Sequence, residues 1–360
     1  MVILTDVSAT SPGKAILFGE HFVVYGYSSI IFAIDKKLRI TIKFGDPEKR
    51  TNNYKNKIRI FSNLGFSAEI FDSKIIMSNR SPSDYSIVKN LNKIMDYLID
   101  KNSNNDDIRH SNNKDITISI DSEIPIGGGL GSSSAFCVSL IGAFYRGLNI
   151  NLDKKAICEK SIEIEKLIYQ NTSGIDCSIC TFGGLGIYSK SFGLKKLEYD
   201  IHDFPFLIID TGISHDTFEL VNRVKKIKER DIELFKKLCK EYERIFNFSI
   251  GSLENKKLES LGILMNENHS LLENLNLSNP VIDKIVNICK MGGTFGTKIT
   301  GSGGGGCVLS LIDGCEQNLV NRLLKKLDEL DLKYFFTTPN DDGFKFESTT
   351  SIYKIDNEKN

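Results

Sequence analysis

The chain has 360 residues, of which 41% are apolar, and its 46 basic residues balance its 46 acidic residues. This length predicts one large or two medium domains, and the neutral net charge gives no indication of nucleic-acid binding. We find neither a signal peptide nor an apolar run of about 18 residues, so we expect a cytoplasmic protein that does not span a membrane. Eight scattered cysteines are typical of buried thiols in a reducing compartment.

The first half of the chain is predicted to alternate strands with helices. Strands are expected within residues 5–43, around the segment Ser11–Gly26, and again at 116–120, where apolar β-branched residues alternate with polar ones. Helical periodicity marks three segments, namely 87–99, 135–148 and 154–169. Two stretches rich in Asn, Asp, Lys and Ser, 45–58 and 100–114, read as solvated loops.

A glycine-rich loop follows the strand at 116–120. Residues Glu123–Ser134 read EIPIGGGLGSSS, and the four glycines let the backbone turn tightly and approach a ligand. We expect Ser132 or Ser133 to cap the next helix, so that a row of backbone N–H groups suited to phosphate lies at its positive end. The loop is neither a P-loop nor a Gly-x-Gly-x-x-Gly motif, and a plain surface turn is the alternative.

Acidic residues beyond this loop are candidates for chemistry. Helical geometry places Glu165 at the border of a buried face and Glu163 in solvent, with two surface charges as the alternative. Asp176 follows on a Ser-Gly-Ile-Asp turn, where a carboxylate could either accept a proton or cap a helix. Cys177 and Cys180 form a single Cys-x-x-Cys pair, which we interpret as core packing in preference to a zinc site.

The second half is predicted to contain long helices and fewer strands. Strands are expected at 206–210, at 307–312 and near Phe335. Helices are expected at 217–246, 257–274, 280–291 and 317–329. Between the last two helices, Gly296–Cys307 reads GTKITGSGGGGC. Periodicity alone therefore predicts an α+β protein, without an internal repeat of about 20 to 50 residues.

Three of these segments resemble the motifs of the GHMP small-molecule kinases. They are Ser11–Gly26, which reads SPGKAILFGEHFVVYG, the loop Glu123–Ser134, and Gly296–Cys307, in the order that the family shows. Two further stretches, Thr172–Asp176 and Met265–Leu272, are also similar to this family. Within it, the first segment is most similar to the mevalonate kinases, since a galactokinase would differ at several of its positions.

The resemblance implies a two-domain α+β fold with the active site between the domains. A ribosomal-S5-like N-terminal domain would span 1–192, a ferredoxin-like C-terminal domain 193–350, and a tail 351–360. The implied activity is ATP-dependent phosphorylation of the primary hydroxyl of mevalonate, with Mg²⁺ as cofactor. The partner would be this small molecule, without nucleic acid or membrane, and a homodimer stays open. The alternatives are another kinase of the family, acting on phosphomevalonate, the 3-hydroxyl of mevalonate or a sugar, and a non-catalytic binding protein.

The resemblance also implies roles for individual residues. Asp176 would accept the substrate proton, Lys14 would lie beside it, and Ser133 and Glu165 would bind the metal. The nucleotide would contact the glycine loop and the third segment, at Pro125, Ile126, Gly127, Gly128, Gly129, Leu130, Gly131, Ser132, Ser133, Ser134 and Gly303. The substrate would contact Lys14, Glu20, His21, Asp176, Thr300 and Gly301.

The sequence departs from the family pattern at several positions, including Ser134 and Ser302, where alanine is usual, and Thr172, where proline is usual. The family's basic residue after Asp210 corresponds here to His215. None of these changes removes a charged catalytic group.

Overall fold

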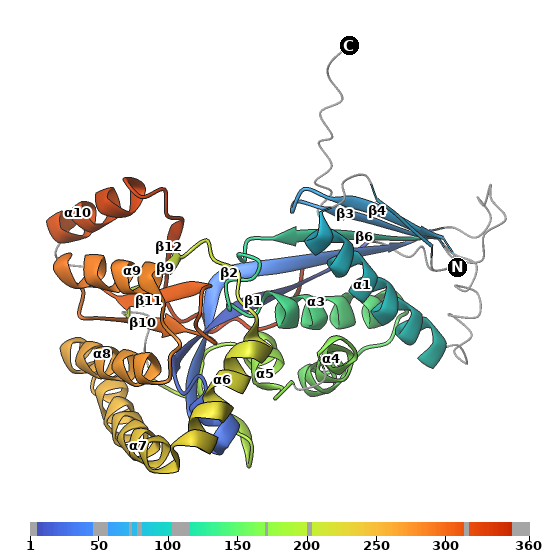
Figure 1. The fold of residues 1–360 in the computed structure, drawn as a ribbon. Coiled ribbons are helices and arrows are strands. Elements are labelled where there is room, and N and C mark those ends of the chain that lie inside the picture. The colour runs from blue at the N-terminus through green and yellow to red at the C-terminus, as the bar shows by residue number, and fades with distance from the viewer. Residues whose placement is uncertain are drawn as a thin grey trace.

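The computed structural model describes residues 6–45, 57–71, 74–77, 81–102, 115–169, 172–199, 204–312 and 317–347. The loops predicted at 45–58 and 100–114 lie almost entirely outside these residues, as does the predicted tail at 351–360. Over the described part of the chain, two sheets with their helices form the two halves of the molecule (Figure 1). No helix of that part is long and apolar enough to cross a membrane.

The first sheet contains nine strands among the described residues. They are β1 (Val7–Phe18), β2 (Ser29–Phe44), β3 (Lys57–Ser62), β4 (Ser67–Phe71), β5 (Lys74–Met77), β6 (Asp115–Ser122), β7 (Leu185–Ser189), β8 (Gly193–Leu197) and β13 (Lys345–Glu347). Their order is β13-β1-β2-β6-β3-β4-β5, and β7 pairs with both β2 and β8. Only β3 and β6 run parallel among these pairs.

Helices of the first half pack beside this sheet. They are the 3₁₀ turn η1 (Phe22–Tyr25) and the α-helices α1 (Pro82–Lys101), α3 (Ser132–Gly147), α4 (Lys154–Ile168) and α5 (Ile175–Phe182). Helix α3 packs against β1 and β2 and contacts α4 and α5 on its other sides (Figure 1). Asp153 caps α4, because its carboxylate accepts from the Ala156 N–H. The helices predicted at 87–99, 135–148 and 154–169 are confirmed within a few residues.

The second sheet has four antiparallel strands in the described part. They are β9 (Phe206–Asp210), β10 (Gly296–Thr300), β11 (Cys307–Leu311) and β12 (Tyr334–Thr337), in the order β10-β11-β9-β12. Its helices are α6 (Thr217–Arg230), α7 (Ile232–Glu254), α8 (Leu258–Asn274), α9 (Pro280–Met291) and α10 (Gln317–Asp328). The single helix predicted at 217–246 is wrong, because Asp231 ends α6 and its carboxylate caps α7 through the Leu234 N–H.

Two strands beyond residue 192 belong to the first sheet. Strand β8 pairs with β7, and β13 pairs with the edge of β1. The change from the first sheet to the second therefore falls between β8 and β9, and the chain returns to the first sheet at its end. The division at 192 remains a prediction, since pairing within a sheet is only one of the criteria that define a domain.

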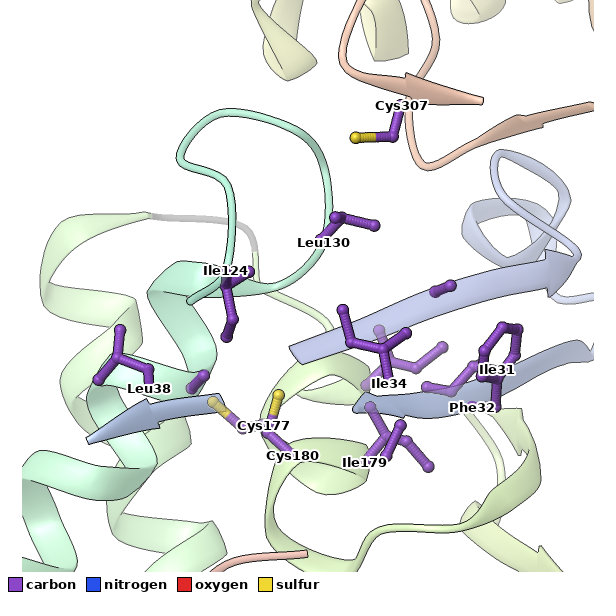
Figure 2. Packing of buried hydrophobic residues seen from close by; sticks show 14 of the residues in the cluster. Ile31, Phe32, Ile34, Leu38, Ile124, Leu130, Cys177, Ile179, Cys180 and Cys307 are labelled. Atoms are coloured by element: carbon purple, nitrogen blue, oxygen red, sulfur yellow. The ribbon is translucent and has the colours of Figure 1, made fainter. Parts of the chain in front are cut away.

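The apolar core is continuous between the two halves. In strand β2, Phe32 is fully buried and stacks on Phe206 of β9, with 5.0 Å between the ring centroids. Figure 2 shows this core beneath the glycine loop, where Leu130 lies between the strands and Cys307 of β11. The same view places Cys177 and Cys180 of α5 inside the core. Both thiols are fully buried, which confirms the interpretation of the Cys-x-x-Cys pair as packing.

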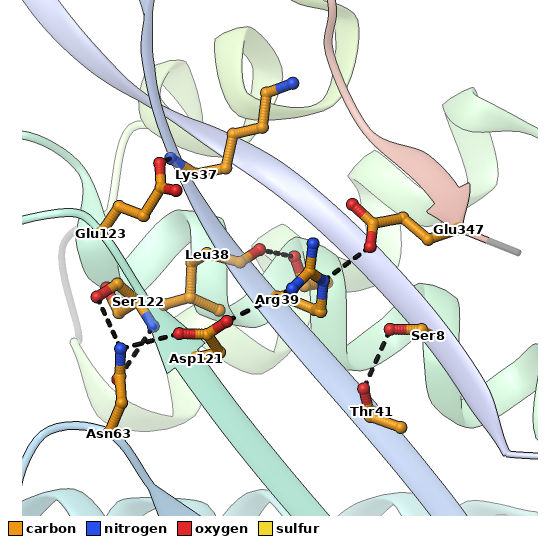
Figure 3. Close-up of polar contacts among 11 residues, drawn as sticks. Ser8, Lys37, Leu38, Arg39, Thr41, Asn63, Asp121, Ser122, Glu123 and Glu347 are labelled. Carbon is orange, nitrogen blue, oxygen red and sulfur yellow. Dashed lines mark hydrogen bonds and ion pairs between the residues drawn. The ribbon is translucent and has the colours of Figure 1, made fainter. Parts of the chain in front are cut away.

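Polar contacts fix the strands from which the glycine loop departs. Arg39 of β2 donates to Glu347 of β13 at 2.6 Å and to Asp121 of β6 at 3.3 Å (Figure 3). At the start of the loop, the Glu123 N–H donates to the Lys37 carbonyl at 2.9 Å, and the Glu123 carboxylate accepts from the Lys37 N–H at 3.3 Å. The loop therefore begins from a fixed point on β2.

Candidate active site

The glycine loop turns into α3 at Gly131. This residue is the helix N-cap with a φ of 73°, and Gly127 and Gly129 have similar positive φ values, a conformation that favours glycine. The prediction that Ser132 or Ser133 caps α3 is wrong, because no side chain caps this helix. The left-handed turn at Gly131 leads the chain into the helix instead, and the first N–H groups of α3 remain available for an anion.

Backbone hydrogen bonds hold this loop from both halves of the molecule. The Lys14 N–H of β1 donates to the Leu130 carbonyl at 2.9 Å, and the Cys307 N–H of β11 donates to the Gly128 carbonyl at 3.1 Å. A Cβ atom on Gly128 would lie 2.9 Å from the Cys307 sulfur, and one on Gly13 would lie 2.8 Å from the Leu130 oxygen. The three motifs found in the sequence therefore meet at this loop, where close contacts require glycine.

The structure brings Lys14 and Asp176 together. The Lys14 Nζ lies 3.4 Å from the Asp176 Oδ2, and the lysine side chain is buried whereas the carboxylate is about one-third exposed, at 31%. Lys14 follows an irregularity in the pairing of β1 with β2, and its Cγ passes beneath Gly131. Asp176 lies in the first turn of α5, which begins at the left-handed Gly174. A carboxylate that faces outward with a buried cation behind it can accept a proton from a bound alcohol.

Glu165 of α4 is buried, as helical geometry predicts. One of its carboxylate oxygens accepts from the Ser134 hydroxyl of α3, and the other accepts from the Thr172 hydroxyl before α5. Burial raises the pKa of Glu165, and these two hydrogen bonds oppose that rise. Glu163 points instead to the surface, where it pairs with Lys101. The prediction that the two glutamates differ in exposure is therefore confirmed.

The donor atoms around Glu165 are suited to magnesium. Carboxylate and hydroxyl oxygens are the hard ligands that Mg²⁺ prefers, and the ion usually keeps several waters besides one or two protein ligands. Glu165 lies next to the first turn of α3, where the loop would hold phosphate groups. The Ser134 hydroxyl contacts the Glu165 carboxylate, whereas the Ser133 hydroxyl lies 3.1 Å from the Tyr169 hydroxyl.

Glu20 forms a buried ion pair that the sequence reading missed. Its carboxylate accepts from the Lys298 ammonium of β10, and both side chains are fully buried. The Lys298 Nζ also donates to the Ile299 carbonyl at 2.6 Å, and Glu20 accepts from the Gly19 N–H at 3.1 Å. Burial raises the pKa of Glu20 and lowers the pKa of Lys298, which disfavours both charges. The opposite charge of each partner counteracts this effect of burial on the other. The pair joins the first motif to the third.

His21 and Thr300 also join these two motifs. The His21 Nε2 lies 2.8 Å from the Ser302 carbonyl oxygen, and because that oxygen only accepts, Nε2 carries the proton. Burial lowers the pKa of His21, which favours the neutral ring. The Thr300 hydroxyl accepts from the Ile16 N–H at 2.9 Å and donates to the Ile16 carbonyl at 3.1 Å. Thr300 thereby contacts β1 through its side chain.

The third motif packs closely with its neighbours. A Cβ atom on Gly301 would lie 3.5 Å from the Gly129 oxygen, and one on Gly303 would lie 2.5 Å from the Leu277 oxygen. Gly301 therefore faces the glycine loop, whereas Gly303 faces Leu277 in the turn that follows α8. His215 lies beside Gly306 in this region, and burial lowers its pKa.

Sequence comparisons agree with the arrangement of these motifs. A family model described as the GHMP kinases N terminal domain matches residues 90–184, and the model for the GHMP kinases C terminal matches residues 249–329. The mevalonate kinase of Pyrococcus horikoshii is 32% identical over 322 residues, which cover 88% of this chain and 92% of that protein. The chain belongs to the GHMP kinase family.

Solved structures share the fold of this GHMP kinase. The crystal structure of Methanococcus jannaschii mevalonate kinase matches with a TM-score of 0.71 at 30% identity, over 92% of this chain and 98% of that one. The L. major mevalonate kinase in complex with R-mevalonate has a TM-score of 0.76 at 22% identity and covers 93% of this chain and 96% of that one. The predicted two-domain α+β fold is confirmed, and the family makes the chain an ATP-dependent kinase.

Lys298 and Thr172 are not among the predicted site residues, although each donates a hydrogen bond to one of them. Lys298 carried a signal, because it is a single charge in the buried segment Gly296–Thr300 and Glu20 is a single charge in another apolar segment. Two such charges of opposite sign are expected to pair. Thr172 is a departure from the family pattern without a predicted role, whereas Ser134 is predicted to contact the nucleotide, and their shared contact with Glu165 depends on the folded geometry.

Proposed function

We propose that this kinase transfers the γ-phosphoryl group of ATP to the primary hydroxyl of mevalonate, giving 5-phosphomevalonate and ADP for isoprenoid precursor synthesis in the cytoplasm. The observation that carries the proposal is the Lys14–Asp176 pair at 3.4 Å beside the glycine loop. The acceptor is chosen from the relatives at 30% identity or more, which are named mevalonate kinases.

In the proposed mechanism, backbone N–H groups of the loop and of the first turn of α3 hold the phosphates of ATP. Asp176 orients the primary hydroxyl of mevalonate and accepts its proton as the oxygen attacks the γ-phosphorus. The proton moves to the Asp176 carboxylate, and the bond from the γ-phosphorus to the ADP oxygen breaks. The buried Lys14 ammonium adds positive charge beside the Asp176 carboxylate and near the transferred group.

Magnesium belongs to the same proposal. Glu165 and the Ser133 hydroxyl would hold it, since both are oxygen donors at the end of the loop. When bound, the ion would neutralise charge on the phosphates of ATP. Mevalonate would lie between Asp176 and the third motif, near Thr300 and Gly301, with Glu20 and His21 holding the wall behind it.

The test is a set of acceptor alcohols assayed with Mg-ATP, followed by phosphorus NMR of the product. We expect turnover of mevalonate and a phosphate signal split by a CH₂ group, because a primary ester has two neighbouring protons and a tertiary ester has none. Phosphomevalonate, galactose and homoserine are the comparison acceptors. Turnover of one of these without turnover of mevalonate, or an unsplit 3-phosphate signal, would contradict the proposed substrate.

A further inference from the structure

The Glu165 carboxylate is held by two hydroxyl groups from two different elements. The Ser134 hydroxyl donates to Oε1, and the Thr172 hydroxyl donates to Oε2. Ser134 is 2% exposed and Glu165 is 4% exposed, so water cannot replace either contact freely. We call Ser134 and Thr172 the hydroxyl clamp of Glu165.

The clamp joins the three helices that build the site. Ser134 lies in the first turn of α3, Glu165 lies near the end of α4, and Thr172 precedes α5. The Thr172 oxygen also accepts from the Gly174 N–H at 3.3 Å. Gly174 is the N-cap of α5, and Asp176 lies in the first turn of this helix. A short chain of hydrogen bonds thus leads from the phosphate loop, through Glu165, to the turn that carries Asp176.

We propose that Ser134 and Thr172 are positioning residues that hold the Glu165 carboxylate in the orientation in which it binds the magnesium of the nucleotide. The proposal rests on the proposed metal role of Glu165. A carboxylate has about four lone-pair sites, so the two hydroxyls and the Cys177 thiol still leave a site free for a metal, while the hydroxyls fix the rotation of the group. Partners of this kind orient metal ligands, and their loss typically weakens metal binding by roughly 10- to 100-fold.

A purely structural role makes a different prediction. If the hydroxyls only satisfy a buried carboxylate, their removal lowers the stability of the free protein and leaves its metal affinity unchanged. If they instead compete with the metal for the carboxylate oxygens, their removal tightens metal binding. The affinity for the metal therefore separates the three cases, and stability alone does not.

The chain offers well-matched variants for this measurement. Ser134→Ala and Thr172→Val each remove one hydroxyl of the clamp with little change in volume, and Thr172→Ser retains the hydroxyl. Ser139→Ala is the control for a lost buried hydroxyl on the same helix, because Ser139 donates to the Leu38 carbonyl at 3.0 Å and not to Glu165. Glu165→Gln tests the metal ligand itself.

The readout is Mn²⁺ binding to the full-length protein with ADP, followed by electron paramagnetic resonance, beside the magnesium dependence of turnover. We expect Ser134→Ala and Thr172→Val to weaken Mn²⁺ binding roughly 10-fold each, with Thr172→Ser and Ser139→Ala close to the unmodified protein. In a Glu165→Gln background, Ser134→Ala should have no further effect on Mn²⁺ binding. Saturating metal should restore most of the turnover of Ser134→Ala and Thr172→Val.

Three results would overturn the clamp. The first is unchanged Mn²⁺ affinity in both Ser134→Ala and Thr172→Val while Glu165→Gln weakens it. The second is tighter Mn²⁺ binding in Ser134→Ala. The third is unchanged Mn²⁺ affinity in Glu165→Gln. This result would mean that Glu165 does not bind the metal, so the clamp could not position a metal ligand. Mevalonate turnover by the unmodified protein tests the proposed function separately from all three.

Discussion

Removing Lys298 should destabilise this kinase strongly, because it would leave a buried charge without its partner. Lys298 and Glu20 are both fully buried, and after Lys298→Met the Glu20 carboxylate loses its cation and keeps backbone N–H donors such as that of Gly19, at 3.1 Å. Breaking a buried ion pair in this way typically costs about 3–5 kcal/mol of unfolding free energy, whereas an exposed pair contributes at most about 1 kcal/mol. Lys326, which is 65% exposed and lies 3.0 Å from Glu329, provides the matched control.

Urea unfolding followed by circular dichroism measures the effect. We expect Lys298→Met to lower the unfolding free energy by about 3–5 kcal/mol and Lys326→Met to lower it by less than about 1 kcal/mol. Glu20→Gln added to Lys298→Met should recover much of the loss, because a neutral amide needs no cation beside it. The reasoning is refuted if Lys298→Met unfolds like the control, or if the double variant is no more stable than Lys298→Met alone.

Three other predictions concern the catalytic pair, the metal and pH. Asp176→Asn should lower kcat by roughly 10²–10⁴-fold with little change in ATP affinity, and a loose transition state places the effect nearer 10²-fold. Near-normal turnover of the folded variant in steady-state kinetics would contradict the catalytic role of Asp176. Ser133→Ala and Glu165→Gln should each raise the magnesium requirement and Glu163→Gln should not, so equal effects of the two glutamates in magnesium titrations would contradict the metal assignment. Burial, and then the nearby Lys298, lowers the pKa of His269 from 6.5 to about 4. The unfolded chain therefore binds the extra proton first, and stability should fall as pH decreases from about 6.5 to 4, by about 3 kcal/mol in total; His269→Leu should flatten this dependence in urea titrations at pH 7 and pH 4.5.

Local sequence predicted the parts of the site whose geometry is set within one element. The glycines in the loop Glu123–Ser134 predict a tight backbone turn, and the structure has glycines with positive φ angles there. The 3.6-residue period of α4 was enough to separate Glu165 from Glu163, since burial of one helix face follows from its apolar residues. The same kind of argument located most of the helices.

Contacts between distant segments could not be read from the sequence in this way. Lys298 and Glu20 are 278 residues apart, and which strand ends meet depends on how two sheets pack. The sequence also does not predict strands β3 to β5, because they are only four to six residues long and lie next to polar segments that are typical of loops. The sequence predicts only a turn at the start of helix α5, because the eight residues of this helix are too few to show a period.

Strand β1 and the turn that follows it set the distance between the two halves at the site. Lys14 contacts the glycine loop and Asp176, Thr300 bonds the Ile16 backbone, and Glu20 pairs with Lys298. One continuous segment therefore holds the catalytic pair at one end and the second sheet at the other. Because a displacement of about 1 Å at a reacting centre can lower a rate roughly 10²-fold, a substitution at the buried ion pair should reduce turnover in molecules that remain folded. The fixed length of β1 and its turn therefore links the stability of the Glu20–Lys298 ion pair to the chemistry at Asp176.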